Sequence, residues 1–147
     1  MKYCCSIIAA ALLCALLLAS GCGSSEQEQV WRSFLKAAAA QRADEALSHL
    51  DLERMTQKYM SANSDAALGM ALLGGSEATA GIVEGMLRDS FAKGEFDFGG
   101  TDLSAISSPS AITTKGDFST LTFQGGRRIE MERIDGEWKI VSFGNTP

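Results

Sequence analysis

The chain has 147 residues, a formal net charge of −5 and an apolar content of 46%. A single domain of this length buries about two-thirds of the surface that its unfolded chain exposes, so one self-sufficient core is expected. An acidic chain has no general attraction for phosphate backbones, and the charge therefore argues against nucleic-acid binding.

The N-terminal segment, residues 1–21, has the composition of an export signal rather than of a folded element. Lys2 provides a short positive start, and an uncharged run of 13 apolar and small residues follows from Ile7 to Ala19. Such a run is too short to cross a hydrocarbon core about 30 Å thick, which takes roughly 20 apolar residues. We therefore separate residues 1–21 from the fold.

The end of this segment, Leu18-Ala19-Ser20-Gly21-Cys22, resembles the lipobox of bacterial lipoproteins. In that family the cysteine thiol receives a diacylglyceryl group and the chain is cut before the cysteine. The resemblance implies cleavage between Gly21 and Cys22 and a membrane anchor on Cys22. The alternative is an ordinary secretory signal cleaved near Ser20 or Gly21, which would leave Cys22 as a free thiol in an oxidising compartment.

Cleavage before Cys22 leaves 126 residues with a net charge of −6, because Lys2 is the only charge lost. The other cysteines leave with the signal: Cys4, Cys5 and Cys14. The mature domain can form no internal disulfide, so its core alone must stabilise it.

Residues 23–29, GSSEQEQ, contain no apolar side chain and predict a flexible tether, so that residues 22–29 form the lipidated cysteine and its linker. Seven extended residues reach about 23–25 Å, enough to hold a domain clear of the lipid head groups. In Gram-negative lipoproteins an aspartate at this position resembles an inner-membrane retention signal, and Gly23 does not match it. The resemblance therefore implies the outer membrane facing the periplasm for such a source, and otherwise the outer face of the cell membrane.

Apolar residues at helical spacing predict a first helix over residues 30–41. Trp31 and Phe34 lie on its apolar stripe, where a partner groove is conceivable and core packing is the ordinary role. Three short helices are predicted to follow, one capped by Asp44, one capped by Asp51 and one over residues 66–73.

A longer helix is predicted from Ser76 to about Lys93, with Gly94 as its stop. Gly81 and Gly85 lie four residues apart on one face, which we interpret as close approach to a sheet or a neighbouring helix. The apolar stripe of this helix comprises Ile82, Val83, Met86, Leu87 and Phe91.

From residue 111 the hydrophobic period changes to two and predicts an antiparallel β-meander. Its strands are expected at residues 111–114, 118–123, 128–134 and 137–143, joined by Lys115-Gly116-Asp117, Gln124-Gly125-Gly126 and Asp135-Gly136, which are typical of hairpin turns. Helices followed by such a meander form an α+β pattern. We expect Trp138 and Ile140 to face the helices, with Val141 and Phe143 on the other side.

Two motifs carry a further resemblance. Trp-Arg-x-Phe-Leu-x-Ala, followed after six residues by Asp-x-Ala-Leu-x-x-Leu, spans residues 31–50, and Asp-Gly-Glu-Trp-Lys-Ile spans residues 135–140. Both resemble small exported proteins of the nuclear transport factor 2-like, or cystatin-like, superfamily, many of which are bacterial lipoproteins of unknown function. The resemblance covers roughly residues 30–143. It implies one α+β domain over residues 30–147, with the N-terminal helices packed on a curved antiparallel meander.

Few residues of the mature chain have side chains suited to catalysis or metal binding. The chain has one histidine, His49, and its one mature cysteine is expected to carry lipid, so neither a metal site nor a cofactor is predicted. Some nuclear transport factor 2-like enzymes pair an aspartate with a histidine for acid–base work, and the resemblance implies a similar role for His49. Its candidate partners are Asp44, Asp51, Glu130 and Glu132. A solvated histidine is the simpler interpretation, because fold alone does not carry function.

Three functions stay open, in this order. The first is a non-enzymatic module tethered through Cys22 that binds an envelope protein or, through the open sheet, a second copy of itself. The second is a carrier or sensor of an apolar, lipid-like ligand, favoured by the methionines within residues 68–91. Its helix–sheet cavity would be lined by Trp31, Phe34, Ile82, Met86, Phe91 and Trp138. The third is an acid–base enzyme using His49.

Overall fold

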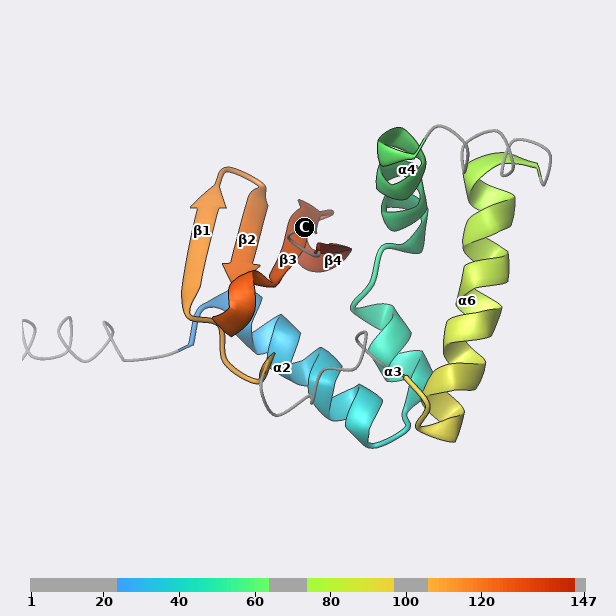
Figure 1. Cartoon of the computed structure of the whole chain (residues 1–147), viewed down its shortest axis with the longest axis horizontal. Helices are drawn as coiled ribbons and strands as arrows, with labels where there is room; N and C mark the ends of the chain where they lie inside the picture. The colour runs from blue at the N-terminus through green and yellow to red at the C-terminus, as the bar shows by residue number, and fades with distance from the viewer. Residues whose placement is uncertain (1–23, 64–73, 97–105, 145–147) are drawn as a thin grey trace, which may run out of the picture.

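The computed structural model describes residues 24–63, 74–96 and 106–144 (Figure 1). The export segment, Cys22 and the helix expected over residues 66–73 lie outside the described residues. Within the described part the fold is α+β, with helices in the N-terminal half and an antiparallel sheet at the C-terminus.

The helices are α2 (Glu26–Ala39), α3 (Ala43–Ser48), α4 (Leu52–Ala62) and α6 (Gly75–Lys93). The strands are β1 (Ala111–Lys115), β2 (Phe118–Thr122), β3 (Arg128–Ile134) and β4 (Glu137–Gly144), with a 3-10 turn, η2 (Gln124–Gly126), between β2 and β3. They pair in chain order, each antiparallel to the next, which confirms the predicted meander to within a residue at each strand end. In the β3–β4 turn Asp135 and Gly136 have φ of 52° and 87°, the positive values that a tight hairpin turn requires.

The first helix begins earlier than predicted. Ser25 caps it by accepting a hydrogen bond from the Glu28 N–H at 3.2 Å, and the Gln29 side chain donates to the Ser24 carbonyl at 2.8 Å. Gln27 is buried and donates to Thr114 Oγ1 at 3.3 Å. The expectation of a flexible tether is therefore wrong from residue 24 onward, because these polar side chains bond to the helix end and to β1 instead of to solvent.

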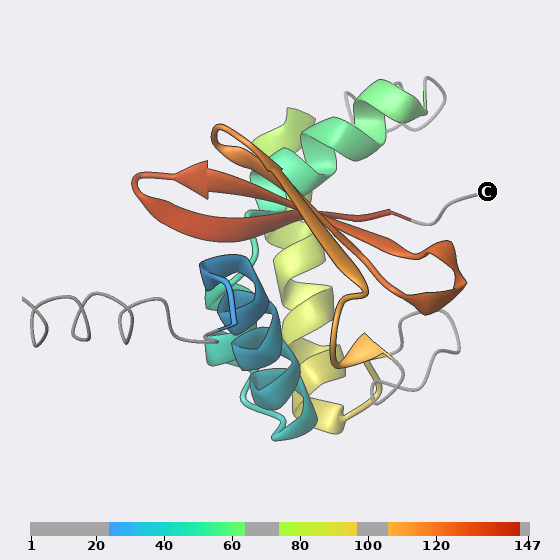
Figure 2. The same cartoon turned by 90° about the vertical axis from the view of Figure 1, so that its left-hand side faces the viewer.

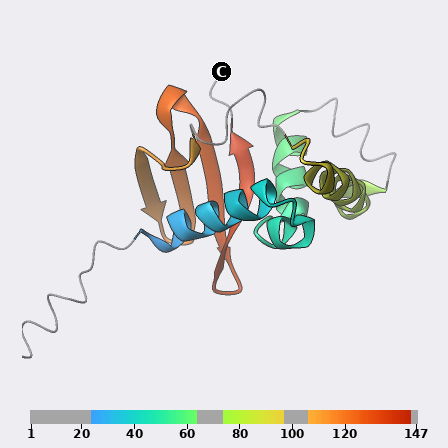
Figure 3. The same cartoon turned by 90° about the horizontal axis from the view of Figure 1, so that it is seen from below.

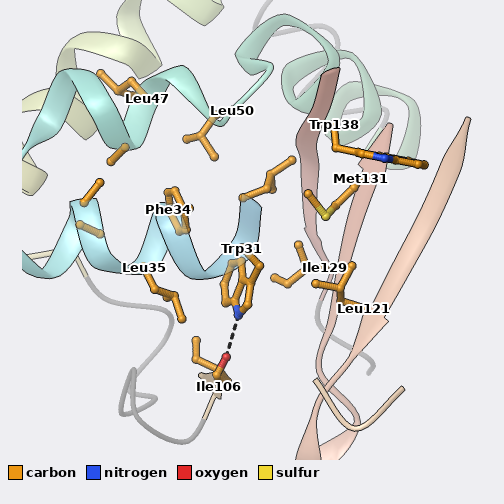
Figure 4. Close-up of a cluster of buried hydrophobic side chains, with 14 of the residues drawn as sticks. Trp31, Phe34, Leu35, Leu47, Leu50, Ile106, Leu121, Ile129, Met131 and Trp138 are labelled. Carbon is orange, nitrogen blue, oxygen red and sulfur yellow. Dashed lines mark hydrogen bonds between the residues drawn. The ribbon is translucent and has the colours of Figure 1, made fainter. Parts of the chain in front are cut away.

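Helix α2 runs across one face of the twisted sheet and supplies the centre of the core (Figures 2 and 3). Trp31 and Phe34 are fully buried, and the indole N–H of Trp31 donates to the Ile106 carbonyl at 2.7 Å (Figure 4). Phe91 of α6 meets Phe34 edge-on, with ring centroids 6.0 Å apart. The sheet contributes Leu121, Ile129, Met131 and Ile140 to the same cluster.

A β-bulge in β4 changes which side chains reach α2. The register shifts between Glu130 and Met131, whose partners are Ser142 and Ile140, so Val141 is an extra residue. Trp138 and Ile140 face the helices as predicted. The prediction for Phe143 is wrong, because the extra residue reverses the alternation and brings its ring 5.8 Å from that of Phe34.

The connection between α3 and α4 covers the middle of the β4 edge. The Ile140 N–H donates to the His49 carbonyl at 2.9 Å, and the Asp51 N–H donates to the Ile140 carbonyl at 3.0 Å. Asp51 also caps α4 as predicted, accepting from the Arg54 N–H at 2.9 Å. Asp44 does not cap α3, because that helix begins at Ala43 with Arg42 as its N-cap.

Helix α6 ends at Gly94, as predicted, with a φ of 68°. Its glycines do not mediate close packing, because a Cβ added at Gly81 or Gly85 would meet nothing within 4 Å. The interpretation that these glycines allow close approach to a neighbouring element is therefore wrong for the described residues.

Candidate functional site

The six residues expected to line an apolar cavity fall into three groups. Trp31, Phe34 and Phe91 are fully buried in the core cluster, where neighbouring rings and aliphatic side chains surround them. Ile82 and Met86 are 51% and 66% exposed on α6. Trp138 is buried at the rim of a cleft. The structure does not bring these residues together around one cavity, because α6 turns only part of its apolar stripe inward.

The outward side of α6 exposes two large apolar side chains, Ile82 and Met86. We call the side formed by Ala78, Gly81, Ile82, Gly85 and Met86 the α6 outer face. All five residues are exposed, since α6 packs on α3 and α4 through residues such as Thr79, Ala80 and Phe91. The two glycines leave bare backbone between the protruding Ile82 and Met86 side chains.

Ion pairs flank the α6 outer face. Arg88 pairs with Glu84 at 2.8 Å and with Asp44 of α3, and these two carboxylates raise the pKa of its guanidinium. Lys93 pairs with Asp89 at 2.6 Å. Each of these charges is satisfied within the chain, so the apolar centre is surrounded by a polar rim, as in many protein–protein interfaces.

A cleft of about 450 Å³ lies between α2 and the β3–β4 turn and contains the single histidine. Its lining comprises Glu26, Gln29, Val30, Ser33, His49, Gly136, Glu137, Trp138 and Lys139. Glu26 accepts hydrogen bonds there from Arg133 at 3.1 Å and from the Trp138 indole at 3.2 Å. The cleft therefore joins the first turn of α2 to the ends of β3 and β4.

Burial lowers the pKa of His49 below its ordinary value, and the nearby Lys139 ammonium adds to this effect. Its Nε2 atom is buried and has no hydrogen-bond partner among the described residues. The expected carboxylate partners are engaged elsewhere: Glu130 with Lys58 at 2.7 Å, Glu132 with Arg54, Asp44 with Arg88, and Asp51 with the start of α4. The predicted pairing of His49 with one of these four carboxylates is therefore wrong, because Glu130 and Glu132 bond to Lys58 and Arg54 of α4 instead.

A larger groove, of about 750 Å³, lies between α4 and the end of β4. Its lining comprises Met55, Lys58, Tyr59, Ser61, Ala62, Asn63, Glu130, Ser142, Phe143 and Gly144. The sequence predicts no ligand site at these groove-lining residues. The repeat of Leu52, Met55 and Tyr59 along one side of α4 was the available signal, but the β-bulge that brings Phe143 beside them has no comparable signature.

In Figure 1 the turn between β1 and β2 lies at the upper end of β1, and the start of α2 lies near its lower end. Gln27 contacts Thr114, the neighbour of Lys115, and the Arg133 N–H donates to the Asp117 carbonyl at 2.8 Å. Phe118 stands opposite Lys115 in the register and is 57% exposed. We call the surface formed by residues 115–118 the β1–β2 turn end.

The chain matches no protein-family model, no curated protein and no solved structure. In the described ranges there is no group of three or more His, Cys, Asp or Glu side chains that could hold a metal ion. None of the described helices is long and apolar enough to cross a membrane. The candidate surfaces therefore rest on their own geometry.

Proposed function

We propose that the protein is a lipid-anchored, non-enzymatic interaction module of the bacterial cell envelope. Cys22 carries the lipid, as the lipobox resemblance implies, and the α6 outer face binds a partner protein. The packing of α2 across one face of an antiparallel sheet also supports the resemblance to the nuclear transport factor 2-like superfamily. The observation that carries the proposal is the exposure of Ile82 and Met86 on a helix whose other side packs on α3 and α4.

The energetics favour an external contact at this face. Full burial of one such side chain contributes about 1.5–3 kcal/mol. Ile82 and Met86 are 51% and 66% exposed, so a partner that covers them gains roughly half of that amount at each position. Each interior helix glycine costs about 0.5–1 kcal/mol relative to alanine. Gly81 and Gly85 have no neighbour within the described chain that requires the missing Cβ. A partner that packs against bare backbone between Ile82 and Met86 accounts for both features.

Photo-crosslinking in intact cells tests this proposal. A photoreactive side chain at Met86 should give a discrete crosslinked product, whose partner mass spectrometry then identifies. The matched control places the same group at Gln57, an exposed position of α4. A second substitution, Ile82→Gln, should abolish the product. Equal crosslinking at the two positions, or no product at Met86, contradicts the proposal.

A second candidate function is a carrier of an apolar ligand, for which the α4–β4 groove is the specific observation. Met55, Tyr59 and Phe143 give it an apolar floor large enough for part of an acyl chain. Native mass spectrometry of the chain without the Cys22 lipid discriminates this function from the first. Co-purified lipid that is lost in a Met55→Lys variant supports the carrier, and an empty groove supports the interaction module.

A further inference from the structure

The α6 outer face combines gaps and protrusions along one helix. Ala78 and Gly85 are both exposed on the same side and lie about two helical turns apart. A Cβ added at Gly85 would meet nothing within 4 Å. Ile82 lies between them along the helix axis and is 51% exposed. A helix that docks here therefore meets a shallow strip of small residues with a protruding aliphatic side chain beside it.

From this pattern we infer that the partner of the α6 outer face is a second copy of this chain, with the two α6 helices packed antiparallel around a two-fold axis near Ile82. The inference rests on the proposed function, because it names the partner of the same face. Among the described elements, α3 and α4 lie on one side of α6 only, so a second helix has room on the other side (Figure 1). A two-fold dimer requires that one surface be complementary to itself.

The α6 outer face meets this requirement in shape. A two-fold axis that passes between Gly81 and Ile82 places Ala78 of each copy opposite Gly85 of the other. Small residues at both positions let the helix axes approach to about 8 Å, the short end of the range for packed helices. The same axis brings the two Ile82 side chains together on one flank, where each covers the exposed surface of the other.

The charges of α6 fit the same arrangement. Asp89 is exposed on the flank that carries Ile82, two turns further along the helix. The two-fold axis brings it beside the start of α6 in the other copy, where the N-cap residue, Gly74, supplies no side-chain hydrogen bond. A carboxylate is favourable there, because the free N–H groups of a first helical turn carry partial positive charge. On the opposite flank, Glu77 of one copy faces Arg88 of the other.

The membrane anchor strengthens this pairing. A contact between two helices of 19 residues is smaller than the roughly 1,200–2,000 Å² that stable complexes bury, so we expect modest affinity in solution. Copies that are anchored through Cys22 share one membrane surface, which raises their effective concentration and favours a weak contact. The lipidated chain in intact cells is therefore the form in which to detect the pair.

Disulfide crosslinking near the two-fold axis tests the inference. The mature chain contains no cysteine other than Cys22, so Ile82→Cys adds a single thiol. In the dimer its counterpart should lie within the Cα separation of about 4.4–6.8 Å that a disulfide requires. Two versions of the chain with different affinity tags are expressed together in intact cells and oxidised. Gln57→Cys, at an exposed position of α4, is the matched control, and the chain without an added cysteine gives the background.

We expect a disulfide-linked species that carries both tags and has twice the mass of the chain, several-fold more abundant for Ile82→Cys than for Gln57→Cys. Adding Gly85→Leu to the Ile82→Cys chain should reduce this species several-fold, because the new side chain fills the gap opposite Ala78. The open space at Gly85 makes this substitution compatible with the fold, which circular dichroism checks. Adding Gln57→Leu instead should leave the yield unchanged.

The photo-crosslinked product at Met86 separates this inference from the proposed function. A Met86 product that contains a different protein, without an Ile82→Cys dimer, keeps the proposed function and overturns the second copy as the partner. The absence of both products overturns the two proposals together. Equal dimer yields for Ile82→Cys and Gln57→Cys overturn the inference alone. A dimer yield that Gly85→Leu leaves unchanged also overturns it, because the contact would then not use the gap at Gly85.

Discussion

Two ends of this domain expose large apolar side chains, and they do so in different settings. At the β1–β2 turn end, Phe118 projects from a short strand beside a turn that carries both charges, on the face of the sheet away from α2. On the α6 outer face, Ile82 and Met86 project from the middle of a 19-residue helix and alternate with glycines.

The difference between the two ends shows that exposure alone does not define a binding site. A single exposed ring such as Phe118 is common on protein surfaces and by itself indicates no partner. The α6 outer face is informative by its composition, since it combines two exposed apolar residues with two glycines that destabilise the helix. Each of the following changes should affect one end and leave the other intact.

Loss of the acyl anchor should have the largest effect. Cys22→Ser removes the thiol that accepts the lipid, and each buried CH₂ of an acyl chain contributes about 0.8 kcal/mol to membrane binding. We expect the variant to move from the membrane fraction to the aqueous fraction in a flotation gradient. Its α6 outer face should still bind the partner once that partner is in solution. Persistent membrane association of Cys22→Ser would show that the anchor lies elsewhere.

Exchanging the apolar side chains should separate the two ends. The Ile82→Gln, Met86→Gln double variant should weaken partner binding at least tenfold, because the two half-exposed side chains together lose about 1.5–3 kcal/mol of burial energy. Phe118→Thr is the matched control at the other end and should leave partner affinity unchanged. Titration calorimetry with the partner protein that the crosslinking identifies measures the affinity of both variants. An equal loss of partner affinity in the two variants would show that both ends belong to one binding surface, and would contradict the comparison.

Replacing the glycines of α6 by alanine should have a smaller effect, which raises the stability of the domain and lowers its affinity for the partner. Gly81→Ala and Gly85→Ala each fill open space and should raise the free energy of unfolding by about 0.5–1 kcal/mol. The same methyl groups should weaken partner binding by holding the partner away from the backbone. Denaturant unfolding and binding titrations on the same variants test this pair of signs, and an Ala92→Gly variant on the same helix should lower stability without affecting the partner.

The sequence predicts the sheet well and the surfaces poorly, for physical reasons. Strand ranges and turns follow from local chemistry such as Asp135-Gly136, and the structure confirms them. Which side of α6 faces solvent depends on the side that α3 and α4 cover. No local pattern in residues 75–93 predicts this. The start of α2 was missed because Glu26 and Gln27 are polar, and their partners Trp138 and Thr114 are about 90–110 residues away in sequence.

The smallest expected effect concerns His49, which belongs to neither end. Burial lowers its pKa from the ordinary 6.5, so the unfolded chain binds a proton that the folded chain releases in the window just below that value. The stability contributed by neutral His49 is therefore complete above about pH 6.5 and is lost as the pH falls through this window. His49 is the only histidine of the chain, so the slope is attributable to it. Denaturant unfolding of the chain without its lipid, from about pH 5 to pH 8, should show a decrease toward low pH that a His49→Gln variant lacks. An identical slope in both proteins would contradict the lowered pKa. Unchanged partner affinity in the His49→Gln variant would show that His49 takes no part in partner binding.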